Sequence, residues 1–252
     1  MPTDKAHALV IRLVDFSETS RVVTFYTREF GKVGALAKGA RRLRGPFAGS
    51  LDLLCVCRIV LIRKHSDSLD LLTEAEMVKA FSPGQRNGLQ VLYAGYYFAE
   101  LLLELTDEND PHPQLFDIAV ESLRELESGT SVRSLVRRFE IAILRETGHM
   151  PFLGGCVSCG KEYSEPSAAW FSVAAGGLVC RTCFKTAGGT VRLSPTSVKT
   201  LQLLGDVSDQ QWRRMQLQAG TDREIGAVTR AAITYLVGRN LRTAQFLGES
   251  PP

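Results

Sequence analysis

The stretch RVVTFYTREFGKVGALAKGARR, residues 21–42, decides the first half of the fold. It opens with RVVTFYT, whose β-branched and aromatic residues are typical of a strand. Phe30-Gly31 then marks a turn, and a second strand-like run begins at Gly31. Two such runs joined by a short turn predict a hairpin at the front of a β-rich domain.

Three further strand-like runs surround this hairpin, over residues 7–17, 51–64 and 68–81. About five strands in roughly 80 residues, with turns marked by glycine, predict a small closed barrel such as an OB-fold, although an SH3-like barrel has a similar pattern. Cys55 and Cys57 lie two apart in one run, so they should face the same side as small buried hydrophobes. We therefore predict a multi-domain α+β chain that begins with an OB-fold β-barrel over residues 1–81.

Helical periodicity replaces the strand pattern after a break at residues 82–88. Apolar residues recur at spacings of three and four from Leu89 to Leu103, which predicts a central helix that is apolar on most sides. Further amphipathic helices are expected over residues 114–126, 131–148, 193–206 and 221–247. Gly148 should end the second of these. The expected inner faces are Leu115, Ile118, Ser122 and Leu126 in the first, and Ile225, Val228, Ala232, Leu236 and Arg239 in the last. Ser194 should cap the third of these helices, and Thr221 with Glu224 has the spacing of a capping box.

Two C-x-x-C pairs, Cys156 with Cys159 and Cys180 with Cys183, contain four of the six cysteines. Two intervening residues allow both sulfurs of a pair to reach one ion, and four thiolates leave no open position for a substrate. Gly160 follows the first pair, and the glycines at 176–177 precede the second, as tight turns require. We predict one structural Zn2+ per chain in a module over residues 151–190, rather than a catalytic zinc or a redox pair.

Enzyme signatures are missing from the sequence. It has no phosphate-binding G-x-x-x-x-G-K-[ST], no G-x-S-x-G and no H-E-x-x-H, and its histidines are scattered. It also shows no secretory signal, and its longest apolar stretch, residues 91–105, contains a glutamate and falls short of a bilayer span. We expect a cytoplasmic protein that is not an enzyme.

Positive charge gathers near the front of the chain. Residues 1–80 carry 13 Lys and Arg against 9 Asp and Glu, whereas residues 84–150 carry 6 against 11. The cations Lys32, Lys38, Arg41, Arg42 and Arg44 stand among glycines, which permit close approach of a phosphate backbone. This pattern predicts a DNA-binding stretch in the barrel, with Phe25, Tyr26, Phe30 or Phe47 available to stack on bases. The alternative is that the cations are only solvated and the aromatic residues fill the barrel.

Several segments resemble the RecO family of bacterial recombination and repair mediators. They are ETSRVVTFYTREFGKVGALAKGARR, YFAELLLELTDENDPHPQLFDIAVESLREL, RRFEIAILRETGHMPFLGGCVSCG and FSVAAGGLVCRTC. The resemblance covers roughly residues 6–190 in order, and the tail from residue 194 agrees in pattern only. Several matching segments in series are far more specific than any single motif.

The resemblance implies an N-terminal OB-fold and an α-helical domain, residues 82–150 and 191–252, with an inserted zinc-binding module built on four cysteines. It implies a nucleoid-associated, cytoplasmic mediator of DNA repair and homologous recombination. Such a protein binds single- and double-stranded DNA, anneals complementary strands, and acts with RecR and single-strand-binding protein to help load RecA. The family's metal ligands map onto the four paired cysteines, and its DNA contacts map onto the basic stretch.

Two questions stay open at the level of sequence. An apolar pocket for the acidic tail of single-strand-binding protein could be rimmed by Arg133, Arg137 and Arg138, or by Arg230, Arg239 and Arg242. The same arginines could instead solvate helix faces. The chain could also be a zinc-containing protein-interaction scaffold without direct DNA binding, and DNA binding at two salt concentrations separates these two interpretations.

Overall fold

The computed structural model describes residues 3–42, 44–64, 68–84, 88–163, 168–206 and 217–247. The chain divides into two compact units, one of residues 1–136 with 243–249 and the other of residues 137–242 with 250–252. The division falls inside one helix, α3 (Val132–Glu146). Among the helices in the described ranges, none combines the length and apolar character needed to cross a lipid bilayer.

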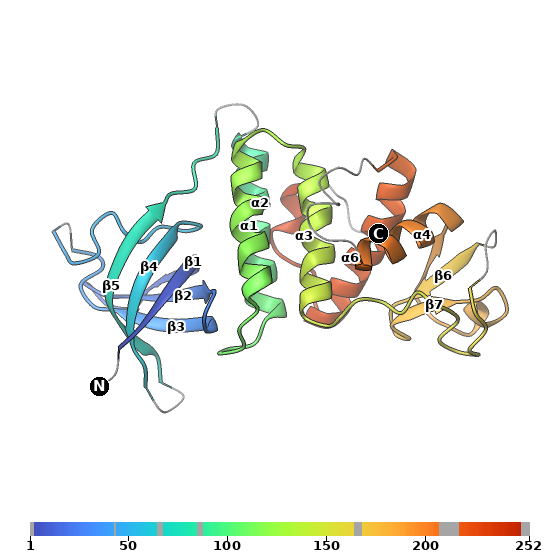
Figure 1. Cartoon of the computed structure of the whole chain (residues 1–252), viewed down its shortest axis with the longest axis horizontal. Helices are drawn as coiled ribbons and strands as arrows, with labels where there is room; N and C mark the ends of the chain where they lie inside the picture. The colour runs from blue at the N-terminus through green and yellow to red at the C-terminus, as the bar shows by residue number, and fades with distance from the viewer. Residues whose placement is uncertain are drawn as a thin grey trace. The chain divides into compact units, whose positions relative to one another are not determined.

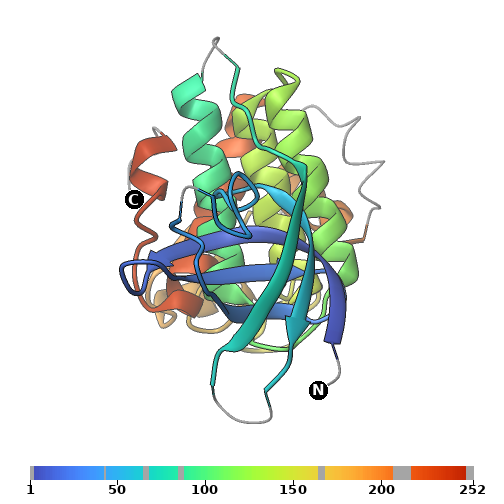
Figure 2. The ribbon, with the colours of Figure 1, turned by 90° about the vertical axis from the view of Figure 1, so that its left-hand side faces the viewer.

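The first unit begins with a closed barrel, labelled in Figure 1 and seen from its own side in Figure 2. Its strands are β1 (Thr3–Asp15), β2 (Arg21–Thr27), β3 (Gly31–Ala37), β4 (Val56–Ile62) and β5 (Asp70–Lys79). β1 pairs with both β2 and β4, with a bulge between Val10 and Arg12, and a short parallel pairing of β3 with β5 closes the ring. The order β1-β2-β3-β5-β4 is that of an OB-fold, so the predicted fold class is confirmed.

The barrel core consists of alternate side chains from each strand. The buried set includes Ala8, Val10, Val23, Phe25, Val33, Ala35, Ile59, Leu61 and Leu72. Cys55 and Cys57 belong to it with no exposed area, and their sulfur atoms lie 3.3 Å apart. The prediction that these two cysteines share one side as buried hydrophobes is therefore confirmed.

Two of the expected strands are shorter in the structure than in the sequence pattern. The run over 31–42 leaves the sheet after Ala37, because Gly39 takes a φ of +78° and consecutive turns follow it. The run over 51–64 enters the sheet only at Val56, because Leu54 has a φ of +65°. Arg41 and Arg42 therefore lie on a loop, where hydrophobic alternation no longer constrains them.

Two helices and a short C-terminal segment complete the first unit. α1 (Gly88–Leu105) buries residues on most sides, and α2 (Pro113–Glu127) buries the predicted face of Leu115, Ile118, Ser122 and Leu126. The 3-10 turn η2 (Ala244–Leu247) packs on α1, where the Phe246 ring stacks on Tyr93 with centroids 4.8 Å apart. Glu100 of α1 also accepts hydrogen bonds from the amide and hydroxyl of Thr243.

The second unit contains most of α3, then β6 (Ala169–Ser172), β7 (Gly177–Val179), η1 (Cys183–Lys185), β8 (Thr190–Leu193), α4 (Pro195–Asp206) and α6 (Ala219–Val237). The three strands form a sheet of order β7-β6-β8. α3 ends at Glu146, and Gly148, with a φ of +74°, follows it as the predicted stop. Ser194 caps α4 as predicted, because its Oγ accepts a hydrogen bond from the Ser197 amide.

Two sequence expectations for α6 are wrong. The helix begins at Ala219, so Thr221 and Glu224 do not form a capping box; Glu224 instead accepts from the amide and hydroxyl of Ser194. Leu236, expected on the inner side, is 39% exposed, and α6 ends at Val237 before Arg239. The inner face comprises Ile225, Val228, Thr229, Ala232 and Ile233.

A buried polar network joins α3 to α6 inside the second unit. Arg137 is 1% exposed, and its guanidinium donates to Glu140, to Asp222 Oδ1 at 3.3 Å and to Thr229 Oγ1 at 2.9 Å. Arg138 is 4% exposed. The suggestion that Arg137 and Arg138 rim a surface pocket is therefore wrong, because both side chains lie in the interior.

Candidate metal centre and nucleic-acid interface

The first cysteine pair forms a tight turn around the Cys156 carbonyl. The Gly160 amide donates to Cys156 O at 2.8 Å, and the Cys156 amide donates to Lys161 O at 2.8 Å. Gly160 has a φ of +73°, a conformation that an L side chain rarely adopts. The sequence prediction of a glycine-dependent turn behind the first pair is confirmed.

The second pair follows the β6–β7 hairpin, whose turn contains Gly176 with a φ of +70°. The amides of Cys183 and Phe184 donate to Cys180 O at 3.1 and 3.0 Å, which winds the chain around the second pair. A β-carbon on Gly177 would lie 2.6 Å from the Phe152 carbonyl oxygen, so this position requires glycine. Both glycines therefore allow the hairpin to deliver Cys180 and Cys183 opposite the first pair.

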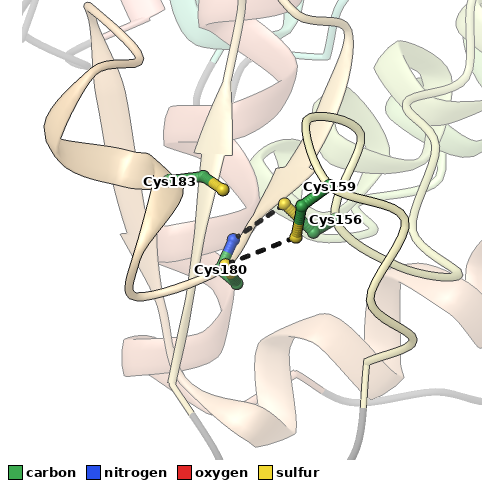
Figure 3. Close-up of side chains that lie close together, drawn as sticks. All are labelled: Cys156, Cys159, Cys180 and Cys183. Atoms are coloured by element: carbon green, nitrogen blue, oxygen red, sulfur yellow. Dashed lines mark hydrogen bonds between the residues drawn. The ribbon is translucent and has the colours of Figure 1, made fainter.

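The four side chains point toward one another in Figure 3. Their sulfur atoms all lie within 4.8 Å of one another, and Cys159 Sγ is 3.9 Å from Cys180 Sγ. Tetrahedral ligation with metal–sulfur bonds of about 2.3 Å would separate the sulfurs by about 3.8 Å. The donor set thus fits a four-coordinate metal ion, and all four predicted ligands are brought together.

Backbone amides favour the thiolate form at two of these cysteines. Burial acts to raise the pKa of Cys156, but N–H groups of Cys180, Ser158 and Cys159 outweigh it and lower the pKa to about 6. Backbone N–H groups of Cys183 and Thr182 lower the pKa of Cys180. Hydrogen bonds with the Cys180 and Cys159 side chains raise the pKa of Cys183 to about 12. The backbone around Cys156 and Cys180 therefore favours the deprotonated sulfur that metals bind.

Four cations form what we call the basic loop, which follows β3 and consists of Lys38, Arg41, Arg42 and Arg44; all four are exposed. Arg41 is anchored: its amide donates to Thr19 O at 3.0 Å, its Nη1 donates to Ser17 O at 2.7 Å, and its Nε lies 3.4 Å from Asp15 Oδ2. Across the described ranges, Lys38, Arg42 and Arg44 have no side-chain ion pair. The loop thus presents cations to solvent at one end of the barrel.

Lys32 is separated from this loop. It lies half-buried on β3, and its Nζ donates to Thr106 O and, at 2.7 Å, to Leu103 O at the carboxyl end of α1. Burial lowers its pKa, while the nearby carboxylates of Glu108 and Asp107 act in the opposite direction. A cation at a helix carboxyl end stabilises the helix, so Lys32 has a structural task that sequence spacing did not reveal.

The aromatic residues suggested for base stacking are not on the surface. Phe25 and Tyr26 have no exposed area and Phe47 is 3% exposed, so the suggestion is wrong for all three. Phe30 is half-buried, with the Arg63 guanidinium 5.0 Å from its ring centroid. Sequence reasoning missed Phe16, which is 63% exposed on the turn between β1 and β2. The turn residues Ser17 and Ser20 beside it are the signal that could have identified it.

Comparison with known proteins decides the family. The model described as Recombination protein O N terminal matches residues 1–81, and the model described as Recombination protein O C terminal matches residues 86–245. The chain belongs to the RecO family. The resemblance inferred from the sequence is therefore confirmed, and with it a function in DNA repair and recombination.

Relatives named DNA repair protein RecO extend the match over the full length. The protein of Rhodopirellula baltica is 47% identical over 177 residues, 70% of this chain and 65% of that relative, just under two thirds of its length. The protein of Syntrophus aciditrophicus is 30% identical over 249 residues, 98% of this chain and 96% of that relative. The protein of Bacillus pumilus is 27% identical over 245 residues, 97% of this chain and 93% of that relative.

Proposed function

We propose that this RecO-family chain is a non-enzymatic recombination mediator that binds single- and double-stranded DNA through its barrel and anneals complementary strands. In this role it acts with RecR on DNA coated by single-strand-binding protein and helps RecA to load, in the cytoplasm at the nucleoid. The observation that carries the proposal is the basic loop. Its four exposed cations stand on a closed OB-type barrel in a chain of the RecO family.

The basic loop can perform annealing without covalent chemistry. Two complementary strands repel each other through their phosphates, and a cationic surface lowers that repulsion by displacing counterions. Guanidinium groups bind phosphate oxygens with matched geometry and leave base edges free to pair. Residues Lys38, Arg42 and Arg44 are available for this contact, whereas Arg41 also braces the loop through Ser17 and Asp15.

The metal module has a separate, structural role in this proposal. Cys156, Cys159, Cys180 and Cys183 would hold one Zn2+ ion, and four thiolate ligands leave it no open position for catalysis. A segment of this size forms little hydrophobic core, so ligation replaces part of that core in holding the two turns together. The module is therefore a brace for the second unit.

Salt dependence of DNA binding tests the basic loop. Binding of an oligonucleotide such as (dT)20 should weaken with salt, with a log–log slope of roughly −2 to −5. Replacing Arg41, Arg42 and Arg44 together by alanine should reduce the magnitude of that slope by about 2, because about 0.7 of a counterion is released per phosphate on a single strand. Arg58→Ala is the matched control, since this exposed barrel arginine pairs with Glu76 outside the loop.

An unchanged slope in the triple variant would move the DNA site away from the loop. A chain that ignores DNA even in dilute buffer would reject the mediator proposal and favour a protein-interaction scaffold. If DNA binds as expected, annealing of strands coated by single-strand-binding protein, with and without RecR, tests the finer role.

Elemental analysis tests the metal assignment. Untagged protein should contain one zinc per chain, and Cys156→Ser with Cys180→Ser should abolish it. Cys55→Ala and Cys57→Ala should retain the metal, because these buried cysteines lie in the barrel core. Metal-free protein with four reactive thiols in the module would contradict the assignment.

A further inference from the structure

Phe16 is an unusually exposed aromatic side chain on the barrel. Its exposed fraction is 63%, whereas Phe25 has none and Phe47 has 3%. Phe246, at 49%, covers one ring face by stacking on Tyr93, but none of the ring contacts described for this chain involves Phe16. Burying a phenylalanine side chain normally stabilises a fold. The fold does not obtain that stabilisation from Phe16, so its position calls for another explanation.

The turn that presents Phe16 is well held. The amides of Phe16 and Ser17 both donate to Ser20 O, at 3.1 and 3.3 Å, and the Ser20 amide donates to Ser17 Oγ at 3.1 Å. Asp15, the residue before Phe16, accepts from Arg21 Nε at 2.9 Å. The backbone of Phe16 is thus fixed, and its ring is offered to solvent from an ordered turn.

The same turn is fastened to the basic loop. Arg41 reaches both neighbours of Phe16, with its Nη1 donating to Ser17 O at 2.7 Å and its Nε 3.4 Å from Asp15 Oδ2. Strand pairing brings the segments together as well, since Asp15 pairs with Arg21 and Arg21 with Ala37, the residue before Lys38. An exposed aromatic ring and a row of cations therefore share one end of the barrel.

This combination matches the chemistry of an unpaired nucleic-acid strand. Proteins that hold single strands without sequence preference use cations for phosphates and aromatic rings for base faces. We propose that the Phe16 ring stacks on one unpaired base of a strand whose phosphates lie on the basic loop, an inference that rests on the proposed function. Stacking uses the face of the base and leaves its pairing edge free, so this contact is compatible with annealing. Phe16 thereby gives single strands an advantage over duplexes, whose bases are already stacked.

Phe16→Ala tests the stacking contact. Affinity for (dT)20 should fall by about 5- to 150-fold, the loss expected when one base–aromatic stack is removed. Affinity for a duplex of the same length and the slope of affinity against salt should both stay unchanged, because no phosphate contact is lost. Phe152→Ala is the matched control, since this phenylalanine of the cysteine module is 58% exposed.

An abasic oligonucleotide sharpens the test. Wild-type affinity should drop on a strand whose bases are removed, whereas the affinity of Phe16→Ala should change little, because its stacking partner is already missing. Phe16→Trp should keep wild-type affinity, and its added fluorescence should be quenched by (dT)20. Loss of affinity on base removal that is equal in wild type and Phe16→Ala would overturn the proposal.

The failure of this inference is distinguishable from failure of the mediator role. If Phe16→Ala binds (dT)20 as tightly as wild type while the triple arginine variant loses its salt slope, the DNA site stands and stacking at Phe16 is rejected. If the wild-type chain binds no oligonucleotide, both proposals fall. If Phe16→Ala keeps DNA affinity but loses capture of purified single-strand-binding protein or RecR, the ring is a protein contact and the stacking proposal is rejected.

Discussion

Two arginine doublets, Arg41-Arg42 in the basic loop and Arg137-Arg138 in α3, occupy opposite environments. The side chain of Arg41 is 37% exposed and its ion-pair partner Asp15 is 53% exposed. Arg137 is 1% exposed and is held by Glu140, Asp222 and Thr229. The difference comes from the partners: Arg137 meets buried groups of α3 and α6, whereas Arg41 meets an exposed carboxylate and stays near water. A cation cluster therefore indicates a binding surface only where the fold has not already neutralised it.

The largest expected effect comes from the buried doublet. Arg137→Met removes the guanidinium that donates to Glu140 and Asp222, and breaking a buried ion pair costs about 3–5 kcal/mol. The free energy of unfolding in urea measures this loss. Arg58→Met, which removes one partner of an exposed pair, should change stability by less than about 1 kcal/mol. An equal loss of unfolding free energy in the two variants would contradict the proposed difference between buried and exposed arginines.

Gly226→Ala probes the same network from α6. A β-carbon there would lie 2.2 Å from Nη2 of Arg137, so we expect a loss of about 1–3 kcal/mol from overpacking. Alanine normally stabilises a helix relative to glycine by about 1 kcal/mol, and Gly220→Ala, which has open space around it, should show that gain. Combining Gly226→Ala with Arg137→Met should cost less than the sum of the two single losses. Strict additivity in thermal unfolding would show that the two residues do not touch.

Lys32 is half-buried, so its exposure lies between those of the two arginine doublets. Lys32→Met removes the ammonium that caps the carboxyl end of α1, and we expect a loss of about 1 kcal/mol because the site is half-buried. Hydrogen exchange of the last turn of α1 should accelerate with it. Lys38→Met, an exposed lysine on the basic loop, should leave both quantities unchanged. An unaltered α1 in Lys32→Met would return Lys32 to the set of candidate DNA contacts.

The smallest effect on stability belongs to the loop itself. Replacing Arg41, Arg42 and Arg44 by alanine should change the free energy of unfolding by less than about 1 kcal/mol, because the only ion pair lost within the described residues is the exposed one with Asp15. The same variant is expected to lose DNA affinity. A large loss of stability would show that these arginines, like Arg137, have a structural role.

Regular patterns were readable from the sequence, and irregular ones were not. Alternation and helical spacing predicted the barrel, the buried faces of α2 and α3, and the convergence of Cys156, Cys159, Cys180 and Cys183, because each depends on local periodicity or short spacing. The ends of β3 and β4 were missed because Gly39 and Leu54 reverse the chain where the hydrophobic pattern continues.

Contacts between distant segments explain the remaining errors. Nothing near Arg137 in the sequence shows that Asp222 and Thr229 will meet it, and nothing near Lys32 shows that α1 will end beside it. Phe16 was overlooked because the strand expected over residues 7–17 included it, whereas β1 ends at Asp15 and leaves Phe16 on an exposed turn. The exposed turn beside a strand was the better place to look.

The edge strands of the two sheets affect how readily the chain can associate with a second copy of itself. In the barrel, β1 is paired along both edges, and a short parallel pairing of β3 with β5 closes the ring. In the small sheet, β7 is covered along its outer side, where Leu178 hydrogen-bonds to both Phe152 and Val157, and the opposite margin, β8, is only four residues long. The small sheet therefore offers a second copy only short edges for strand addition, which limits self-association through this sheet.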